Sequence, residues 1–213
     1  PPCLVVLGPG RSGTSLLMQA LGALGVRLSD SMIAPGRENP AGFFEDAGIV
    51  RIQADLLRAL GAWPFSPLPA DWRAHPATAE AAARLRAVLL AECRPGAPIW
   101  GFKDPRTASF LPLWREVFAT AGVSPRYVLA LRAPGAVAAS FARAYGVSVE
   151  AAEQVWVMRT CESLLHTGAQ CHVVHYEDWF RAPQAVLAGL SALTDHAGVN
   201  VPAKCSVSAP PSR

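Results

Sequence analysis

The chain has 213 residues, of which 51% are hydrophobic and 16% charged, and its formal net charge is +3. This length allows one α/β domain with a buried core, and the composition excludes an intrinsically disordered chain. The mild charge argues against nucleic acid as a partner, and no apolar run is long enough for a membrane span. We expect one domain over residues 1–202, followed by a flexible, Pro- and Ser-rich tail over residues 203–213.

Five cysteines are present, and no two of them form a C-x-x-C pair. An odd number of unpaired cysteines argues against a disulfide framework or a structural zinc site. We therefore expect a reducing, cytoplasmic location and no bound metal. The sequence opens at Pro1 without a Met, so the lack of a targeting segment excludes little.

Short apolar runs rich in branched residues predict buried strands, and helical spacing predicts the segments between them. The predicted strands are Cys3–Leu7, Ile99–Lys103, Tyr127–Arg132 and Cys171–Tyr176. The predicted helices are Thr14–Leu24, Ile49–Leu60, Thr78–Glu92, Ala108–Ala119, Pro134–Tyr145, Val149–His166 and Pro183–Leu193. This alternation predicts an α/β fold, with a central parallel sheet flanked by helices and ligands bound at the carboxyl ends of its strands.

A glycine-rich loop, Gly8-Pro-Gly-Arg-Ser-Gly-Thr-Ser15, joins the first predicted strand to the first predicted helix. Loop amides and a helix N-terminus together form a cradle for an anion, and the three glycines admit positive φ angles and close approach of the backbone. A Walker A loop has Lys after its last glycine, where this chain has Thr14, and the cation is Arg11 instead. The alternative is a plain strand-to-helix turn.

Cations also stand at the ends of two other predicted strands. Lys103 ends the second strand, where an ammonium group would neutralise negative charge, and Arg106 follows it either as a second anion ligand or as a surface residue. Arg132 ends the third strand, and Ser140 lies eight residues later on the next helix. The third strand ends without the Asp of a Walker B motif, so Mg²⁺ ligation has no obvious source.

These segments together resemble a known family. Arg11-Ser-Gly-Thr-Ser15 after an apolar strand is similar to the 5′-phosphosulfate loop of sulfotransferases that use 3′-phosphoadenosine 5′-phosphosulfate (PAPS). Arg132 with Ser140 resembles their 3′-phosphate site, and Phe102–Arg106 resembles the lysine-bearing strand end between the two sites. His175–Asp178 and Asn39–Glu45 are similar to two further segments of the family, and the five motifs occur in the family's order.

The resemblance implies a P-loop-like three-layer fold and transfer of a sulfuryl group from PAPS to a hydroxyl or amine, with PAP as product and no metal required. It implies that Lys103 and Arg11 act on the reacting phosphosulfate and that Arg132 clamps the 3′-phosphate. The donor-binding residues it implies are Gly10, Arg11, Ser12, Gly13, Thr14, Ser15, Arg132 and Ser140.

The catalytic base is less clear from the resemblance. Pro105 occupies the position at which cytosolic small-molecule sulfotransferases have a histidine. Other members use a glutamate from the region after the first helix, which points to Glu45, with Glu38 and Asp46 as alternatives. Glu45 has a structural alternative of its own, as a charge at the N-terminus of the following helix.

The acceptor is expected to be a carbohydrate or another small molecule, and the sequence does not fix the oligomeric state. Its binding depends on the irregular segment Arg27–Asp46 and on the Pro- and Trp-rich excursion Trp63–Pro76. Trp63 and Trp72 of that excursion are candidates either for stacking on a sugar or for packing. Two other functions stay open: a divergent P-loop kinase or NTPase, and a non-catalytic nucleotide-binding domain.

Overall fold

The computed structural model describes residues 1–36, 39 and 42–194, and in these residues the strands form one parallel sheet in the order β2-β1-β3-β4. The strands are β1 (Pro2–Leu7), β2 (Trp100–Lys103), β3 (Ser124–Leu131) and β4 (Cys171–His175). All four predicted strands are confirmed. β3 begins earlier than predicted because Ser124 and Pro125 continue the pairing with β1.

All seven predicted helices are present, with ends shifted by a few residues. They are α1 (Thr14–Ala23), α2 (Ala47–Ala59), α3 (Pro76–Glu92), α4 (Thr107–Ala121), α5 (Pro134–Tyr145), α6 (Val149–Thr167) and α8 (Pro183–Ser191). A short helix α7 (Asp178–Arg181) and a 3₁₀ turn at Trp72–Ala74 were not predicted. The proposed tail over residues 203–213 lies outside the described residues.

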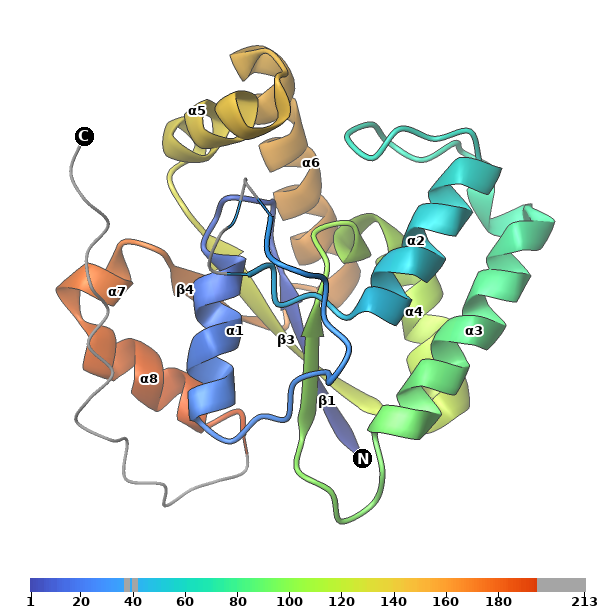
Figure 1. The fold of residues 1–213 in the computed structure, drawn as a ribbon, viewed down its shortest axis with the longest axis horizontal. Coiled ribbons are helices and arrows are strands. Elements are labelled where there is room, and N and C mark those ends of the chain that lie inside the picture. Colours follow the sequence, from blue (N-terminus) through green and yellow to red (C-terminus); the bar gives the residue numbers. More distant parts are fainter. Residues whose placement is uncertain (37–38, 40–41, 195–213) are drawn as a thin grey trace.

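The sheet lies between two layers of helices, so the predicted α/β fold is confirmed (Figure 1). Leu4 and Val6 of β1 point to one face, where they pack with buried residues of α1 and α8. Val5 and Leu7 point to the other face and pack with residues of α2, α3 and α4. Alternate side chains of a strand point to opposite faces, so an all-apolar strand such as β1 fits a sheet covered on both sides.

Because the strands are parallel, their carboxyl ends meet at one edge of the sheet. The neighbour order places the glycine loop after β1 between Lys103, at the end of β2, and Arg132, just after β3. Gly8 is required where the loop leaves β1, since its φ is 132° and a Cβ there would lie 2.6 Å from the carbonyl oxygen of Ala130. The three predicted anion-binding clusters therefore share one edge.

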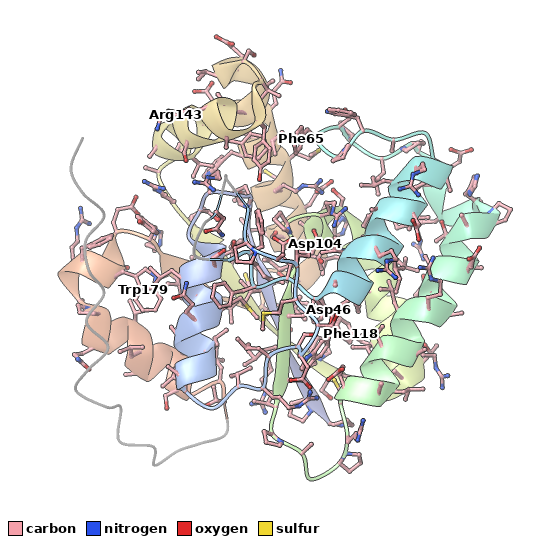
Figure 2. The ribbon with its side chains drawn as sticks, viewed as in Figure 1. Asp46, Phe65, Asp104, Phe118, Arg143 and Trp179 are labelled. Atoms are coloured by element: carbon pink, nitrogen blue, oxygen red, sulfur yellow. The ribbon has the colours of Figure 1, made fainter. Side chains whose placement is uncertain are left out.

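Helices α5 and α6 pack on each other beyond this edge, and a third apolar cluster lies between them (Figure 1). Phe141 of α5 and Val155 of α6 are buried in this cluster, and Phe65 from the Trp63–Pro76 excursion packs against it (Figure 2). Trp72, also from the excursion, is buried and packs edge-on against Phe110 of α4, whereas Trp63 is 63% exposed. The excursion is thus anchored at both ends, and one of its aromatic side chains faces the carboxyl edge.

Candidate active site

The carboxyl edge of the sheet holds a buried ion pair between Lys103 and Glu45. The Lys103 Nζ donates to Glu45 Oε1 at 2.8 Å, and the two side chains are 4% and 12% exposed. These residues are 58 positions apart in the chain, so their contact is tertiary. The structure brings together the two residues that the resemblance assigned to leaving-group stabilisation and to proton removal.

Asp46, and not Glu45, caps the N-terminus of the helix that follows, α2. Asp46 is the N-cap of α2, because its Oδ1 accepts from the Ile49 amide at 2.7 Å and its Oδ2 accepts from Ser29 Oγ at 2.5 Å. Both carboxyl oxygens of Asp46 are therefore engaged in structure, which leaves the Glu45 carboxylate to face Lys103. Glu38, the other alternative for the base, lies outside the described residues.

The backbone just before Glu45 adopts an unusual conformation. Phe44 has a φ of 56°, in the left-handed region that bulky residues rarely enter, and Gly42 has a φ of 102°. The carbonyl oxygen of Glu45 accepts a hydrogen bond from the Ile33 amide at 2.9 Å, which holds the C-terminal end of this strained segment in place. Strained backbone of this kind is concentrated at functional sites, where the surrounding structure holds it.

Burial raises the pKa of the Glu45 carboxyl above its usual value, although the positive charge of Lys103 opposes this shift. The negative charge of nearby Asp104 adds to the increase. A carboxylate with a raised pKa is a stronger base than an exposed carboxylate. The site therefore tunes Glu45 in the direction that proton removal requires.

Asp104 and Arg106 form a second ion pair close to the Lys103–Glu45 pair. Arg106 Nη2 lies 2.6 Å from Asp104 Oδ2, and Gln53 Nε2 donates to the same oxygen at 2.8 Å. Burial alone would raise the pKa of Asp104, but Arg106 and its hydrogen bonds outweigh it and keep that pKa below its usual value. Arg106 is thus neither a surface residue nor an uncommitted anion ligand. Sequence reasoning missed Gln53, which has no motif to mark it.

The glycine loop has the left-handed residues that a tight anion loop needs, but not all at the expected positions. Gly8, Gly13 and Arg11 have positive φ angles, whereas Gly10 does not. A Cβ on Gly13 would lie 2.5 Å from the ring of Tyr176, so that ring packs directly on the loop. α1 has no side-chain cap at its N-terminus, which leaves its first amides facing an anion position.

The three hydroxyl side chains of the glycine loop that were predicted to bind PAPS have different contacts in the structure. Ser12 is buried, and its Oγ donates to the carbonyl oxygen of Pro9 at 2.6 Å, which closes the loop itself. Ser15 Oγ donates to the Phe43 carbonyl at 3.2 Å and accepts from Asn39 Nδ2 at 3.0 Å. Thr14 is 5% exposed at the start of α1. Ser15 therefore joins the glycine loop to the segment that carries Glu45.

Arg11, Arg132 and Ser140 meet on the other side of the glycine loop. Arg11 Nε donates to Ser140 Oγ at 3.2 Å, and Arg132 Nη1 donates to the Arg11 carbonyl oxygen at 3.2 Å. Two further residues hold Arg132: Trp156, which sequence reasoning missed, and Tyr176, which lies in the His175–Asp178 motif but had no assigned role. The ring of Tyr176 lies 4.3 Å below its guanidinium carbon, and Trp156 Nε1 donates to its carbonyl oxygen at 3.1 Å.

A cavity of about 220 Å³, called here the Glu45 cavity, adjoins the ion pair. Its lining includes Glu45 and Pro105, from the strand-end region, and Gly10 of the glycine loop. Four aromatic residues form one wall, and the rest of the lining includes three charged side chains: Phe43, Phe65, Phe141 and Tyr145, with Asp104, Arg106 and Arg159. A small molecule bound there would have direct access to the Glu45 carboxylate.

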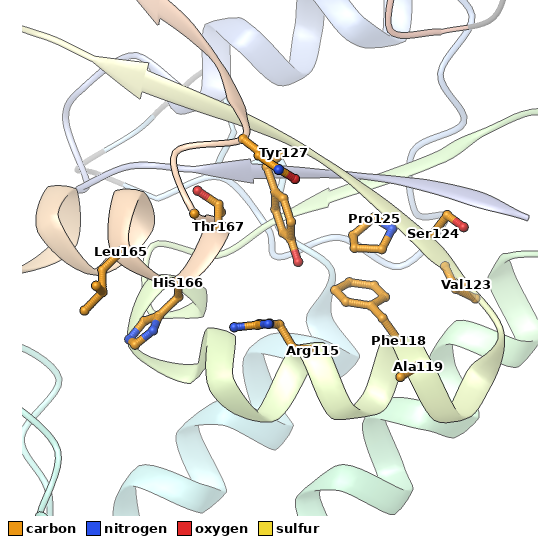
Figure 3. Close-up of a pocket in the computed structure, with 12 residues that line it drawn as sticks. Arg115, Phe118, Ala119, Val123, Ser124, Pro125, Tyr127, Leu165, His166 and Thr167 are labelled. Atoms are coloured by element: carbon orange, nitrogen blue, oxygen red, sulfur yellow. The ribbon is translucent and has the colours of Figure 1, made fainter.

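A larger pocket of about 620 Å³, the Tyr127 pocket, lies at the opposite end of the sheet, where β3 and β4 begin (Figure 3). Arg115 and Phe118 of α4 face Tyr127 and Pro125 across it, and His166 of α6 stands at one side (Figure 3). None of the predicted site residues lines this pocket.

In the described part of the chain, no cluster of three or more His, Cys, Asp or Glu side chains is arranged to hold a metal ion. The helices of residues 1–36, 39 and 42–194 include none with the length and hydropathy of a membrane span.

Solved structures with similar folds include two sulfotransferase domains. One is from the curacin biosynthetic pathway, with 19% identity and a TM-score of 0.52, and the other is from the Synechococcus PCC 7002 olefin synthase, with 23% identity and a TM-score of 0.53. Each match covers 91% of this chain and 73% of the other chain. A putative kinase from Chloroflexus aurantiacus aligns with a TM-score of only 0.36, which carries no argument.

A comparison with curated proteins finds no significant match. The profile of the sulfotransferase family matches residues 2–202, nearly the whole chain. The chain therefore belongs to the sulfotransferase family.

Proposed function

We propose that this protein transfers the sulfuryl group of PAPS to a hydroxyl of a small acceptor, with Glu45 as general base and Lys103 as the cation at the leaving group. The observation that carries the proposal is the buried 2.8 Å contact between these two side chains at the carboxyl edge of a parallel sheet, next to the glycine loop. Ligands of open α/β sheets bind outside this edge.

The donor would bind across the edge from the glycine loop to Arg132. The 5′-phosphosulfate would accept hydrogen bonds from the first amides of α1 and from Arg11. The 3′-phosphate would lie by Arg132 and Ser140, which the structure holds together through Arg11. A guanidinium presents paired donors that match phosphate oxygens, and stacking on Tyr176 fixes its plane.

In the reaction, the acceptor oxygen attacks the sulfur of PAPS, and the bond between sulfur and the bridging phosphate oxygen breaks. The acceptor proton goes to the Glu45 carboxylate, and the negative charge that develops on the bridging oxygen stays on PAP. An ammonium group has three donors, and Glu45 occupies one of those of Lys103, so two are left for the leaving oxygen. Lys103 would thus stabilise both the ionised base and the departing phosphate.

The test is transfer of ³⁵S from labelled PAPS to a panel of small alcohols, phenols and sugars, by wild type and Lys103→Ala. We expect labelled product with the wild type and a loss of about 10²- to 10³-fold in turnover for the variant, the usual effect of removing one charge-stabilising donor. Circular dichroism of the variant checks that it folds. No ³⁵S product from any acceptor, or transfer of ³²P from Mg·[γ-³²P]ATP instead, would reject the sulfotransferase function in favour of a kinase or a non-catalytic domain.

A further inference from the structure

The Glu45 cavity has a wall of interlocking aromatic rings. Phe65 meets Phe141 edge-on, with ring centroids 5.0 Å apart and an interplanar angle of 74°, and it lies 5.4 Å from the ring of Tyr145. The rings of Phe141 and Tyr145 are 4.4 Å apart. These spacings are those of favourable aromatic pairs, so the wall is a packed surface rather than a set of independent side chains.

A buried arginine places Phe65 in that wall. Arg159 of α6 is 3% exposed, and its Nη2 donates to the carbonyl oxygen of Pro64 at 2.7 Å. The same guanidinium contacts Ser109 and lies 3.5 Å from Glu162. This hydrogen bond connects the Trp63–Pro76 excursion to α6 at Pro64, the residue before Phe65, and so restricts the position of the Phe65 ring.

Besides Glu45, three charged side chains line the cavity, and each of them has protein partners: Asp104, Arg106 and Arg159. Arg106 is paired with Asp104 and also donates to the Val50 carbonyl at 3.2 Å, while Arg159 is held by Pro64 and Ser109. A sugar would bring several hydroxyls, each of which needs a partner once it leaves water. The faces of the aromatic rings supply none, and the wall includes one hydroxyl, that of Tyr145, whereas an apolar body gains from burial against the rings.

Resting on the function proposed above, we infer that the acceptor is a compact, apolar alcohol or phenol, and that Phe65 is the residue that selects it over a carbohydrate. Glu45 is the cavity's ionisable group beside Lys103, so the acceptor hydroxyl lies at that end and the hydrocarbon body lies against Phe65 and Phe141. The cavity volume of about 220 Å³ is below the ~300 Å³ at which pockets for drug-sized ligands begin, which limits the body to a small ring system or its aliphatic equivalent.

The test is calorimetric titration with 2-naphthol and with methyl β-D-glucopyranoside, each with and without saturating PAP. We expect 2-naphthol to bind at least ~10-fold more tightly than the glucoside. Phe65→Ala should weaken 2-naphthol binding by about 10-fold and leave PAP binding unchanged. The matched control is Leu165→Ala, which removes a 73%-exposed apolar side chain that lines the Tyr127 pocket instead.

Equal or tighter binding of the glucoside, no binding of 2-naphthol, or equal effects of the Phe65 and Leu165 substitutions would overturn the inference. These outcomes are separable from failure of the proposed function, because PAP is also titrated alone into the wild type and both variants. If the wild type does not bind PAP, the sulfotransferase reaction is contradicted. The titrations without PAP would still measure whether the aromatic wall prefers 2-naphthol to the glucoside.

Discussion

The Tyr127 pocket and the Glu45 cavity differ in the charged groups around them, and their volumes do not show this difference. The Tyr127 pocket, about 620 Å³, is the larger, yet it lies where strands begin and is lined by none of the clustered cations. The Glu45 cavity, about 220 Å³, lies where strands end and is bounded by the glycine loop and a buried ion pair. The comparison teaches that converging charges and helix N-termini, rather than volume, point to the proposed site, since volume alone would favour the opposite end of the sheet.

Burial raises the pKa of an ionisable group in each of the two cavities, with different chemical consequences. Burial raises the pKa of Tyr127 to about 12, so its hydroxyl stays protonated near neutral pH and is no base there. Burial also raises the pKa of Glu45, but from the much lower value of a carboxyl group and against the opposing charge of Lys103. The same direction of shift therefore makes the Glu45 carboxylate a stronger base and keeps the Tyr127 hydroxyl protonated.

The largest effect is expected from Glu45→Gln, which keeps the shape and an acceptor oxygen for Lys103 but removes the base. Turnover should fall by about 10²- to 10⁴-fold, the range of general-base catalysis, with PAP binding retained. In the wild type, kcat/KM should fall as the pH drops through the Glu45 pKa, because protonation removes the base. That acidic limb should lie above the ~4.3 of a free glutamate and should vanish in the variant. Unchanged turnover in the variant would remove Glu45 from the mechanism.

A smaller effect is expected from Arg132→Ala, which tests the donor side of the same edge. Loss of a charge-assisted contact to phosphate should weaken PAP binding by roughly 10- to 100-fold. Binding of ADP, which has no 3′-phosphate, should change by much less. Isothermal titration of both nucleotides measures the ratio, and a parallel loss for PAP and ADP would show that Arg132 does not read the 3′-phosphate.

The smallest effect is expected from Arg115→Ala in the Tyr127 pocket. This exposed side chain faces Tyr127 and lies at the opposite end of the sheet from the ion pair (Figure 3). An exposed substitution away from the chemistry changes stability or binding by about 0.5 kcal/mol or less, so kcat/KM should stay within ~2-fold of the wild type. A steady-state loss comparable to that of Glu45→Gln would give the larger pocket a role in the reaction and break the comparison.

The sequence predicts the fold well because its signals are local. The apolar run before Gly8, the cation at Lys103 and the Arg132–Ser140 spacing each lie within one strand and the loop or helix that follows it. Parallel pairing then brings the strand ends to one edge without further information. The proximity of Arg11, Arg132 and Ser140 follows from that topology.

The parts of the site that the sequence does not reveal depend on contacts between distant segments. Gln53 on Asp104, Arg159 on Pro64 and Tyr176 on Gly13 each join elements far apart in the chain. Gln53 and Arg159 lie in no motif, and Tyr176 lies in one that assigns it no role. The sequence alone does not distinguish a buried arginine from a surface arginine. The left-handed residue expected at Gly10 is found at Arg11 instead, because the loop's own packing decides which residue turns.

The central claim is that the carboxyl edge binds a nucleotide by its 3′-phosphate, and a thermal-melt comparison of PAP, ADP and Mg·ATP tests it most directly. A ligand at ~100 times its Kd adds about 2.7 kcal/mol, which for a domain of this size is a rise in Tm of roughly 5–10 °C. The account predicts that rise with PAP and little change with ADP at the same concentration. Equal rises, or a larger one with Mg·ATP, would contradict it.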